Sequence, residues 1–163
     1  MRSHAHYQDG FTFAELIVVL GIGVILFGIT SITLFRTQRS TKLTTTTQTF
    51  ISDLNRQQSK AMVGATEGRE VSDSYGVYVS INSYMLFHGP SYVAGDPANF
   101  TVSLDAGTTI TTTLPGSTVV FFKGSGGLSA FVSGANTITL TSADGNDHQT
   151  ITLNRYGVIV GVN

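Results

Sequence analysis

The chain has 163 residues, enough for one domain, and a net charge of −1. Only 12% of the residues are charged and 41% are apolar, which excludes a disordered acidic or basic tail. The sequence contains no cysteine, which excludes a disulfide framework, a thiolate metal site and a cysteine nucleophile. The near-neutral net charge argues against binding of nucleic acid through bulk electrostatics.

The charges are distributed unevenly along the chain. Residues 11–35 contain a single charged residue, Glu15. Residues 36–63 contain five cationic residues against one acid, a net charge of +4, and residues 64–163 contain three cationic residues against seven acids, a net charge of −4. The sequence therefore predicts an apolar segment, a basic stem and an acidic remainder.

Residues 11–35 form the apolar segment. As a helix that rises 1.5 Å per residue, it would extend for roughly 37 Å, enough to cross a hydrocarbon core of about 30 Å. A buried core helix is the alternative, and the length of the segment disfavours it. A cleaved secretory signal is also disfavoured, because the apolar stretch is too long and no clear processing site follows it. We therefore predict a retained transmembrane anchor.

Glu15 is anomalous in this apolar segment. A carboxylate near the centre of a bilayer costs about 2.5–3.5 kcal/mol on insertion scales, and less near an interface. No lysine, arginine or histidine follows Glu15 within the segment, so its cationic partner would come from another chain or from a newly formed amino group. The alternative is an acid that snorkels to the interface or is protonated, without a role in assembly.

Residues 10–20, with the sequence GFTFAELIVVL, resemble the prepilin-type junction of type IV pilins and type II secretion pseudopilins. The resemblance implies that a prepilin peptidase cleaves between Gly10 and Phe11, after which Phe11 is N-methylated. It also implies that Glu15 pairs with the N-terminal amine of a neighbouring subunit during filament assembly. Asp9 stands before the junction, where the family usually carries a basic residue.

This resemblance also implies a location and a set of partners. Residues 1–10 would be the leader peptide, and the chain would cross the inner membrane once, with its head outside the cytoplasm, before it enters a periplasmic or cell-surface filament. Its partners would be prepilin peptidase, other pilin or pseudopilin subunits, the inner-membrane assembly platform and the lipid bilayer. The positive-inside rule alone would place the basic stem in the cytoplasm, so the orientation rests on the resemblance.

Residues 36–63 can continue the helix, because no proline precedes Pro90. Six residues spaced alternately by four and three share one helix face: Leu43, Thr47, Phe50, Leu54, Gln57 and Ala61. Gly64 is the predicted helix end, which gives a helix on the order of 80 Å long over residues 11–63. We expect its basic residues to meet acids of neighbouring subunits or lipid headgroups.

Residues 64–163 alternate in the manner of strands. Residues 76–81 and 84–87 flank Asn82-Ser83 and predict a hairpin. Further strands are predicted at residues 100–104, 108–114, 118–123, 128–132, 137–141, 150–153 and 158–162, a spacing typical of an antiparallel β-domain. The predicted fold is α+β, a long pilin-like N-terminal helix packed on an antiparallel β-sheet head.

The order of elements also resembles the family, and more narrowly its minor pseudopilins of the GspH and FimT type. Residues 50–54, 119–122 and 151–159 suggest this narrower resemblance. We therefore predict a structural subunit, a minor pilin or pseudopilin, of a type IV pilus-like or type II secretion filament. The alternatives are a signal-anchored surface protein with a β-rich binding head that does not polymerise, and an anchored hydrolase.

Other motifs carry little chemistry. Gly21-x-Gly23 lies inside the predicted anchor, and the three glycines within residues 124–127 lack the lysine and the following helix of a phosphate loop. No nucleophile elbow occurs. His88 and His148 are isolated, and the acidic turn 144–147 lacks the distal glutamate of a calcium loop and suits a hairpin turn. We predict no catalytic residue, no cofactor, no metal site and, because the head is acidic, no nucleic-acid partner for it.

Overall fold

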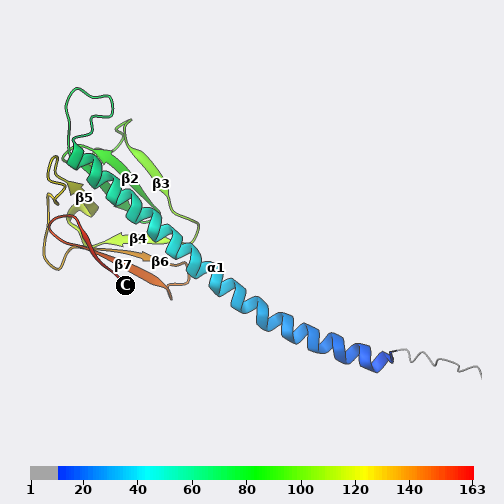
Figure 1. Ribbon diagram of the computed structural model, residues 1–163. Coiled ribbons are helices and arrows are strands. Elements are labelled where there is room, and N and C mark those ends of the chain that lie inside the picture. The colour runs from blue at the N-terminus through cyan, green and yellow to red at the C-terminus, as the bar shows by residue number, and fades with distance from the viewer. Residues whose placement is uncertain (1–10) are drawn as a thin grey trace, which may run out of the picture. The chain divides into compact units, whose positions relative to one another are not determined.

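The computed structural model describes residues 11–163, without the side chains of residues 30–40 (Figure 1). The chain divides into two compact units, Met1–Gln38 and Arg39–Asn163, which are described in turn. Helix α1 spans Phe13–Val63. It is followed by β1 (Tyr75–Ser80), β2 (Ser83–His88), β3 (Phe100–Ser103), β4 (Thr109–Thr112), η1 (Pro115–Ser117), β5 (Thr118–Phe121), β6 (Thr137–Thr141), β7 (His148–Leu153) and β8 (Ile159–Val162).

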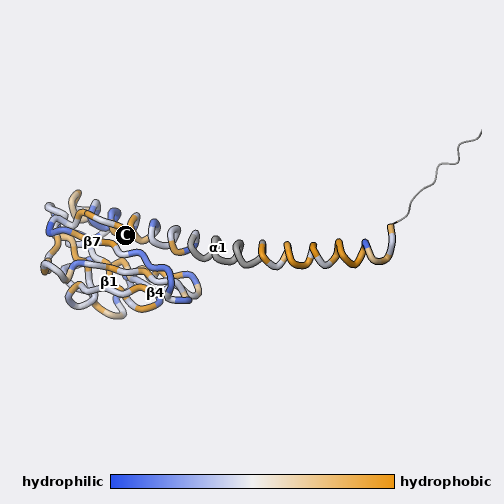
Figure 2. Tube along the Cα trace, turned by 90° about the horizontal axis from the view of Figure 1, so that it is seen from below, coloured by the Kyte–Doolittle hydropathy of each residue, from blue (hydrophilic) through white to orange (hydrophobic). Residues whose placement is uncertain are grey.

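In the first unit, the described part of α1 is apolar on all sides. Every side chain of residues 11–29 is exposed, and Figure 2 shows hydrophobic residues on each turn of this stretch. A helix that is hydrophobic all round normally lies in a protein core, in a membrane or against other helices. This stretch therefore presents a large apolar surface that its own unit leaves uncovered.

The predicted membrane anchor, residues 11–35, finds no support among the described residues. Within them, no helical segment combines the length and the hydropathy needed to cross a bilayer. The side chains of residues 30–35, the last part of the predicted anchor, lie outside the described set. The predicted leader, residues 1–10, lies outside it as well.

In the second unit, residues 39–63 of α1 pack on the sheets through the predicted face. All six of its residues are buried, with exposed fractions of 4% or less: Leu43, Thr47, Phe50, Leu54, Gln57 and Ala61. The hydroxyl of Thr47 donates to the carbonyl of Leu43 at 2.8 Å, which satisfies this buried polar group within the helix. The alternating spacing of four and three residues is thus confirmed as the core-facing face.

Helix α1 ends where Gly64 predicts. Gly64 adopts a φ of 65°, in the left-handed region that glycine enters without steric cost. The amide of Gly64 donates to the carbonyl of Ala61 at 3.3 Å, and the amide of Ala65 donates to the carbonyl of Lys60 at 3.0 Å. These two bonds form a Schellman motif, which satisfies the last carbonyls of the helix and turns the chain toward β1.

The head contains two antiparallel four-stranded sheets, in the orders β3-β2-β1-β5 and β4-β6-β7-β8. The antiparallel α+β class is therefore confirmed, with two sheets in the head. In the β1–β2 hairpin, Ser80 lies opposite Ser83, so the connection is one residue earlier than predicted. The acidic turn lies in the β6–β7 hairpin as predicted, where the amide of Gly145 donates to the carbonyl of Ser142 at 2.9 Å.

The hydrophobic core combines the buried face of α1 with one face of each sheet. The ring of Phe50 packs edge-on against Tyr84, with centroids 4.9 Å apart. The opposite face of the first sheet is covered by the β2–β3 connection. There Tyr92 stacks on Tyr78 at 4.2 Å and meets the edge of the buried Phe87 ring.

The predicted strand at residues 128–132 is wrong. Leu128 forms an isolated bridge with Phe121 and is buried, but residues 129–134 are exposed. This stretch therefore contributes one buried residue, Leu128, to the core and continues as a surface loop, in which Phe131 and Val132 are both exposed. A single buried position does not require a strand.

We expect Gly76→Ala in β1 to destabilise the head strongly. A Cβ at this position would lie 2.4 Å from the Phe87 ring and 2.7 Å from the backbone carbonyl of Val119. Such overpacking lowers the free energy of unfolding by about 1–3 kcal/mol or more. The matched control is Gly161→Ala in β8, whose nearest new neighbour is 3.9 Å away, and it should change stability far less. Chemical denaturation of both variants tests this, and equal losses would contradict it.

Candidate functional site

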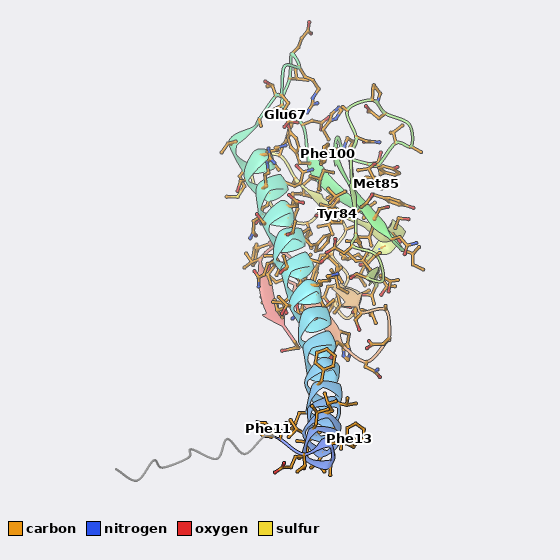
Figure 3. All side chains as sticks on the ribbon, turned by 90° about the vertical axis from the view of Figure 1, so that its right-hand side faces the viewer. Phe11, Phe13, Glu67, Tyr84, Met85 and Phe100 are labelled. Carbon is orange, nitrogen blue, oxygen red and sulfur yellow. The ribbon has the colours of Figure 1, made fainter. Side chains whose placement is uncertain are left out.

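The predicted site residues Phe11 and Glu15 lie at the beginning of α1. Because the helix begins at Phe13, Thr12 is its N-cap and Glu15 is its third residue. Phe11 precedes the cap and is 88% exposed, and Figure 3 shows Phe11 and Phe13 at this end of the helix. Gly10 lies outside the described residues, so the structure describes the predicted cleavage site on its Phe11 side.

Glu15 and Thr12 bond to each other reciprocally. The backbone amide and the hydroxyl of Thr12 both donate to Oε2 of Glu15 at 2.9 Å, and the amide of Glu15 donates to the hydroxyl oxygen of Thr12 at 3.2 Å. This is a capping box, which satisfies backbone amides that a helix start leaves free. Its sequence signal, Thr-x-x-Glu, is present at residues 12–15, and the sequence interpretation missed it.

The capping box gives Glu15 a local role and a defined position. All of its bonds to Thr12 use Oε2, so the second carboxylate oxygen, Oε1, takes no part in the box. The positive end of the helix dipole also favours a negative charge here. Exposed apolar side chains, among them Phe13 and Leu16, surround this carboxylate in the sequence. The arrangement can therefore present an oriented anionic group at the start of an apolar helix.

A second group of charges lies where α1 ends. Nζ of Lys60 is 2.5 Å from Oε1 of Glu67, and Arg69 is 3.6 Å from the other oxygen of Glu67. Lys60 also lies over the ring of Tyr75, whose hydroxyl donates to the carbonyl of Ala65 at 2.8 Å. Lys60 thus pairs with an acid of its own head. The sequence had led us to expect that the basic residues of the stem contact acids of neighbouring subunits or lipid headgroups.

The environment of these groups shifts their proton affinities. The hydrogen bond from Lys60 lowers the pKa of Glu67, and the charges of Lys60 and Arg69 add to this effect against partial burial. Burial raises the pKa of Tyr75, and the charge of Glu67 raises it further. Burial also raises the pKa of Tyr84, together with its hydrogen bond of 2.6 Å to Asp53.

The remaining sequence candidates are not brought together. Within residues 11–163, no three histidine or acidic side chains lie close enough to hold a metal ion. His88 ends β2 in the first sheet, and His148 begins β7 in the second sheet. The two histidines therefore belong to different parts of the head and do not form one site.

We predict that Thr12→Ala increases the exchange of the first-turn amides of α1, whereas Thr12→Ser preserves them. The alanine removes the hydroxyl that accepts from the Glu15 amide, and the loss of an N-cap typically costs about 0.5–2 kcal/mol. Serine retains the acceptor. Hydrogen exchange of the Glu15 amide provides the measurement, and unchanged protection in Thr12→Ala would contradict the cap.

We predict that Glu67→Gln destabilises the head slightly at neutral pH and has no effect in acid. The lowered pKa means that the ion pair stabilises the folded state above the unfolded value of about 4.5, and this contribution is lost as the pH falls through the lower folded value. The loss should stay below about 1 kcal/mol, because the side chain is 42% exposed. Thermal unfolding of the wild type and the variant at several pH values between about 2 and 7 tests this. A difference in stability that does not diminish at low pH would contradict the prediction.

The comparisons with known proteins leave the chain without an assigned family. No protein-family model, no characterised protein and no solved structure matches it. The resemblance of residues 10–20 to the prepilin-type junction accordingly rests on those residues and on the helix that follows them.

Proposed function

We propose that this chain is a structural subunit, a minor pilin or pseudopilin, that enters a type IV pilus-like or type II secretion filament through its N-terminal helix. One observation carries the proposal. Residues 10–20, which resemble a prepilin-type junction, lead directly into a helix whose side chains up to residue 29 are all exposed and almost all apolar, with an oriented carboxylate in its first turn. The chain would act by assembly and not as an enzyme.

The exposed apolar surface supports an assembly role. Contiguous apolar patches of this kind normally mark contacts with a membrane or with other proteins. In the proposed life cycle, residues 11–35 lie in the inner membrane as a single pass and then against neighbouring helices of the filament. Gly21, Gly23 and Gly28 lie in this stretch with open space around them, and small residues of this kind allow another helix to pack closely.

The capping box is compatible with the proposed processing. Cleavage after Gly10 by prepilin peptidase would leave Phe11 as the N-methylated first residue, next to Thr12. Both members of the box, Thr12 and Glu15, would then remain in the mature chain, and Oε1 of Glu15 would be available to the N-terminal amine of a neighbouring subunit. The attraction between these charges is stronger away from water than in it.

The remaining assignments follow the same proposal. The head would lie outside the cytoplasm, and the inner-membrane assembly platform would extract the subunit into a periplasmic or cell-surface filament. The alternative, a signal-anchored surface protein with a binding head, shares the apolar helix but requires neither cleavage after Gly10 nor polymerisation. The processing of the N-terminus therefore distinguishes the two.

The intact mass of the chain purified from a host with prepilin peptidase tests the processing. We expect the loss of residues 1–10 and the addition of one methyl group of about 14 Da on Phe11. A host without the peptidase provides the control and should yield the uncut chain. An uncut N-terminus in the presence of the peptidase would rule out the proposal.

A comparison of Glu15→Gln with Thr12→Ala separates the proposed role of Glu15 in assembly from its role in helix capping. Glutamine removes the charge but keeps an oxygen acceptor for the box, whereas Thr12→Ala weakens the box and keeps the charge. We expect Glu15→Gln to reduce incorporation into filaments at least about tenfold, which corresponds to about 1.4 kcal/mol, with cleavage unchanged. Thr12→Ala should incorporate nearly normally.

Because the chain contains no cysteine, a single introduced cysteine in the exposed head can report incorporation by cross-linking to other subunits. Normal incorporation of Glu15→Gln would contradict a role of the charge. A defect confined to Thr12→Ala would assign Glu15 to helix capping alone.

A further inference from the structure

The head contains a cleft of about 300 Å³ between α1 and the β2–β3 side of the first sheet. Helix α1 contributes Asp53, Arg56, Gln57 and Lys60 to its lining, and the sheet contributes Tyr75, Leu86, His88 and Phe100. Glu67, from the connection between α1 and β1, lines it as well. This volume is at the lower end of the range for small-molecule sites. All of these residues belong to the second unit, so the cleft does not depend on residues 1–38.

Gln57 lines this cleft and carries a buried hydrogen-bond acceptor that has no partner. Its side-chain amide nitrogen donates to the carbonyls of Gly76 at 3.0 Å and Phe87 at 3.4 Å. Since both neighbours are acceptors, the nitrogen must face them, and the amide orientation is determined. Oε1 of Gln57 is buried and has no partner, in a residue that is only 2% exposed. An occupant with an N–H or O–H donor would satisfy this atom.

The charges around Gln57 leave Arg56 without an acidic partner. Lys60 is paired with Glu67, and Asp53 accepts a hydrogen bond from the hydroxyl of Tyr84. No ion pair of Arg56 occurs among the described residues, although its side chain lines the cleft. His88 lies in the same lining as a further nitrogen donor. Arg56 is therefore the cation of this lining that could pair with an anionic group, at a distance from the carboxylate of Asp53 that exceeds an ion pair.

The sheet side of the cleft is apolar. Leu86 is buried, and Phe100 lies opposite it in the β2–β3 register. Phe100 is 64% exposed although it is a large aromatic residue, and Figure 3 shows it near Tyr84 beside α1. An apolar group in the cleft would cover this ring and remove it from water. The cleft thus combines an apolar wall with the unpaired acceptor of Gln57 and the cation of Arg56, and its lining also contains the carboxylate of Asp53 and the Lys60–Glu67 ion pair.

A second, smaller cleft lies next along the same helix. Its volume is about 130 Å³, and its lining includes Thr45 and Thr49 of α1, Tyr84 of β2 and Val102 of β3. Tyr84 donates to Asp53 of the first cleft, so the two clefts adjoin at this hydrogen bond. Together they follow the seam between α1 and the edge strand β3, which suits an extended ligand.

We propose that the first cleft binds an N-acyl amino acid group, the chemistry that the C-terminal residue of a peptide also presents. The carboxylate pairs with Arg56 and lies near His88. The amide N–H donates to Oε1 of Gln57, and an apolar side chain fills the space against Leu86 and Phe100. The preceding residues of a peptide would extend into the second cleft. This inference is independent of the proposed filament function.

Titration of the full chain with N-acetylphenylalanine tests the proposal. Calorimetry provides the affinity, and the side-chain amide resonance of Gln57 should shift on binding. Two probes each remove one interaction: N-acetylphenylalaninamide lacks the carboxylate, and 2-acetoxy-3-phenylpropanoic acid replaces the N–H with an ester oxygen. We expect each to bind at least about tenfold more weakly. Absence of binding by N-acetylphenylalanine, or equal binding of all three probes, would overturn the proposal.

Arg56→Gln tests the cation directly. It should weaken the binding of N-acetylphenylalanine at least about tenfold and leave the binding of N-acetylphenylalaninamide unchanged, because only the acid pairs with Arg56. Lys42→Gln is the matched control, since Lys42 is an exposed cation of α1 that does not line the cleft. The ester probe tests the acceptor without a substitution of Gln57, whose bonds to β1 and β2 the fold needs. Equal effects of the two substitutions would overturn the assignment of Arg56.

A longer probe distinguishes the two sources of this ligand chemistry. Acetyl-Ala-Ala-Phe should bind more tightly than N-acetylphenylalanine if the natural ligand is a peptide C-terminus that enters the second cleft. Equal affinity supports the site with a free N-acyl amino acid as its ligand. Failure of both compounds to bind would overturn the proposal.

Discussion

The head depends on the one buried face of α1 between Leu43 and Ala61. This face connects both sheets to a single core, and its centre is the contact of Phe50 with Tyr84. Two of its six positions are polar, and each is accommodated differently. Thr47 bonds within the helix, whereas Gln57 bonds to carbonyls of β1 and β2. Gln57 therefore links the helix to the first sheet and also lines the cleft beside it.

The two described parts of α1 differ in how much of their surface is buried. Residues 39–63 bury one face and keep their charges outside, as an amphipathic helix does. The described residues 11–29 bury no face within their own unit and carry almost no polar group that water could solvate. The fold of this chain accounts for residues 39–63, whereas the apolar surface of residues 11–29 stays exposed within its own unit and is the basis of the proposed assembly.

In the proposed assembly, Glu15 would have a second role that does not compete with helix capping. The capping box uses Oε2 and anchors the side chain at the helix start, where the dipole favours its charge. A carboxylate held in one position loses less conformational entropy when a cation binds to it, so capping would strengthen the proposed pairing with an amine. The sequence interpretation considered the charge of Glu15 and overlooked its local partner, although Thr12 lies three residues earlier.

The sequence by itself determined the elements whose signals are local. The helix face from Leu43 to Ala61, the helix end at Gly64 and most strands could be predicted, because they depend on periodicity and on glycine conformation. Apart from the hairpins at residues 81–82 and 144–147, it did not determine which strands pair, and so it predicted neither the division into two sheets nor the loss of the strand at residues 128–132. The sequence did not predict the cleft either. Its Gln57, Leu86 and Phe100 meet only through contacts between distant segments, and tertiary structure alone decides whether a buried acceptor finds a donor.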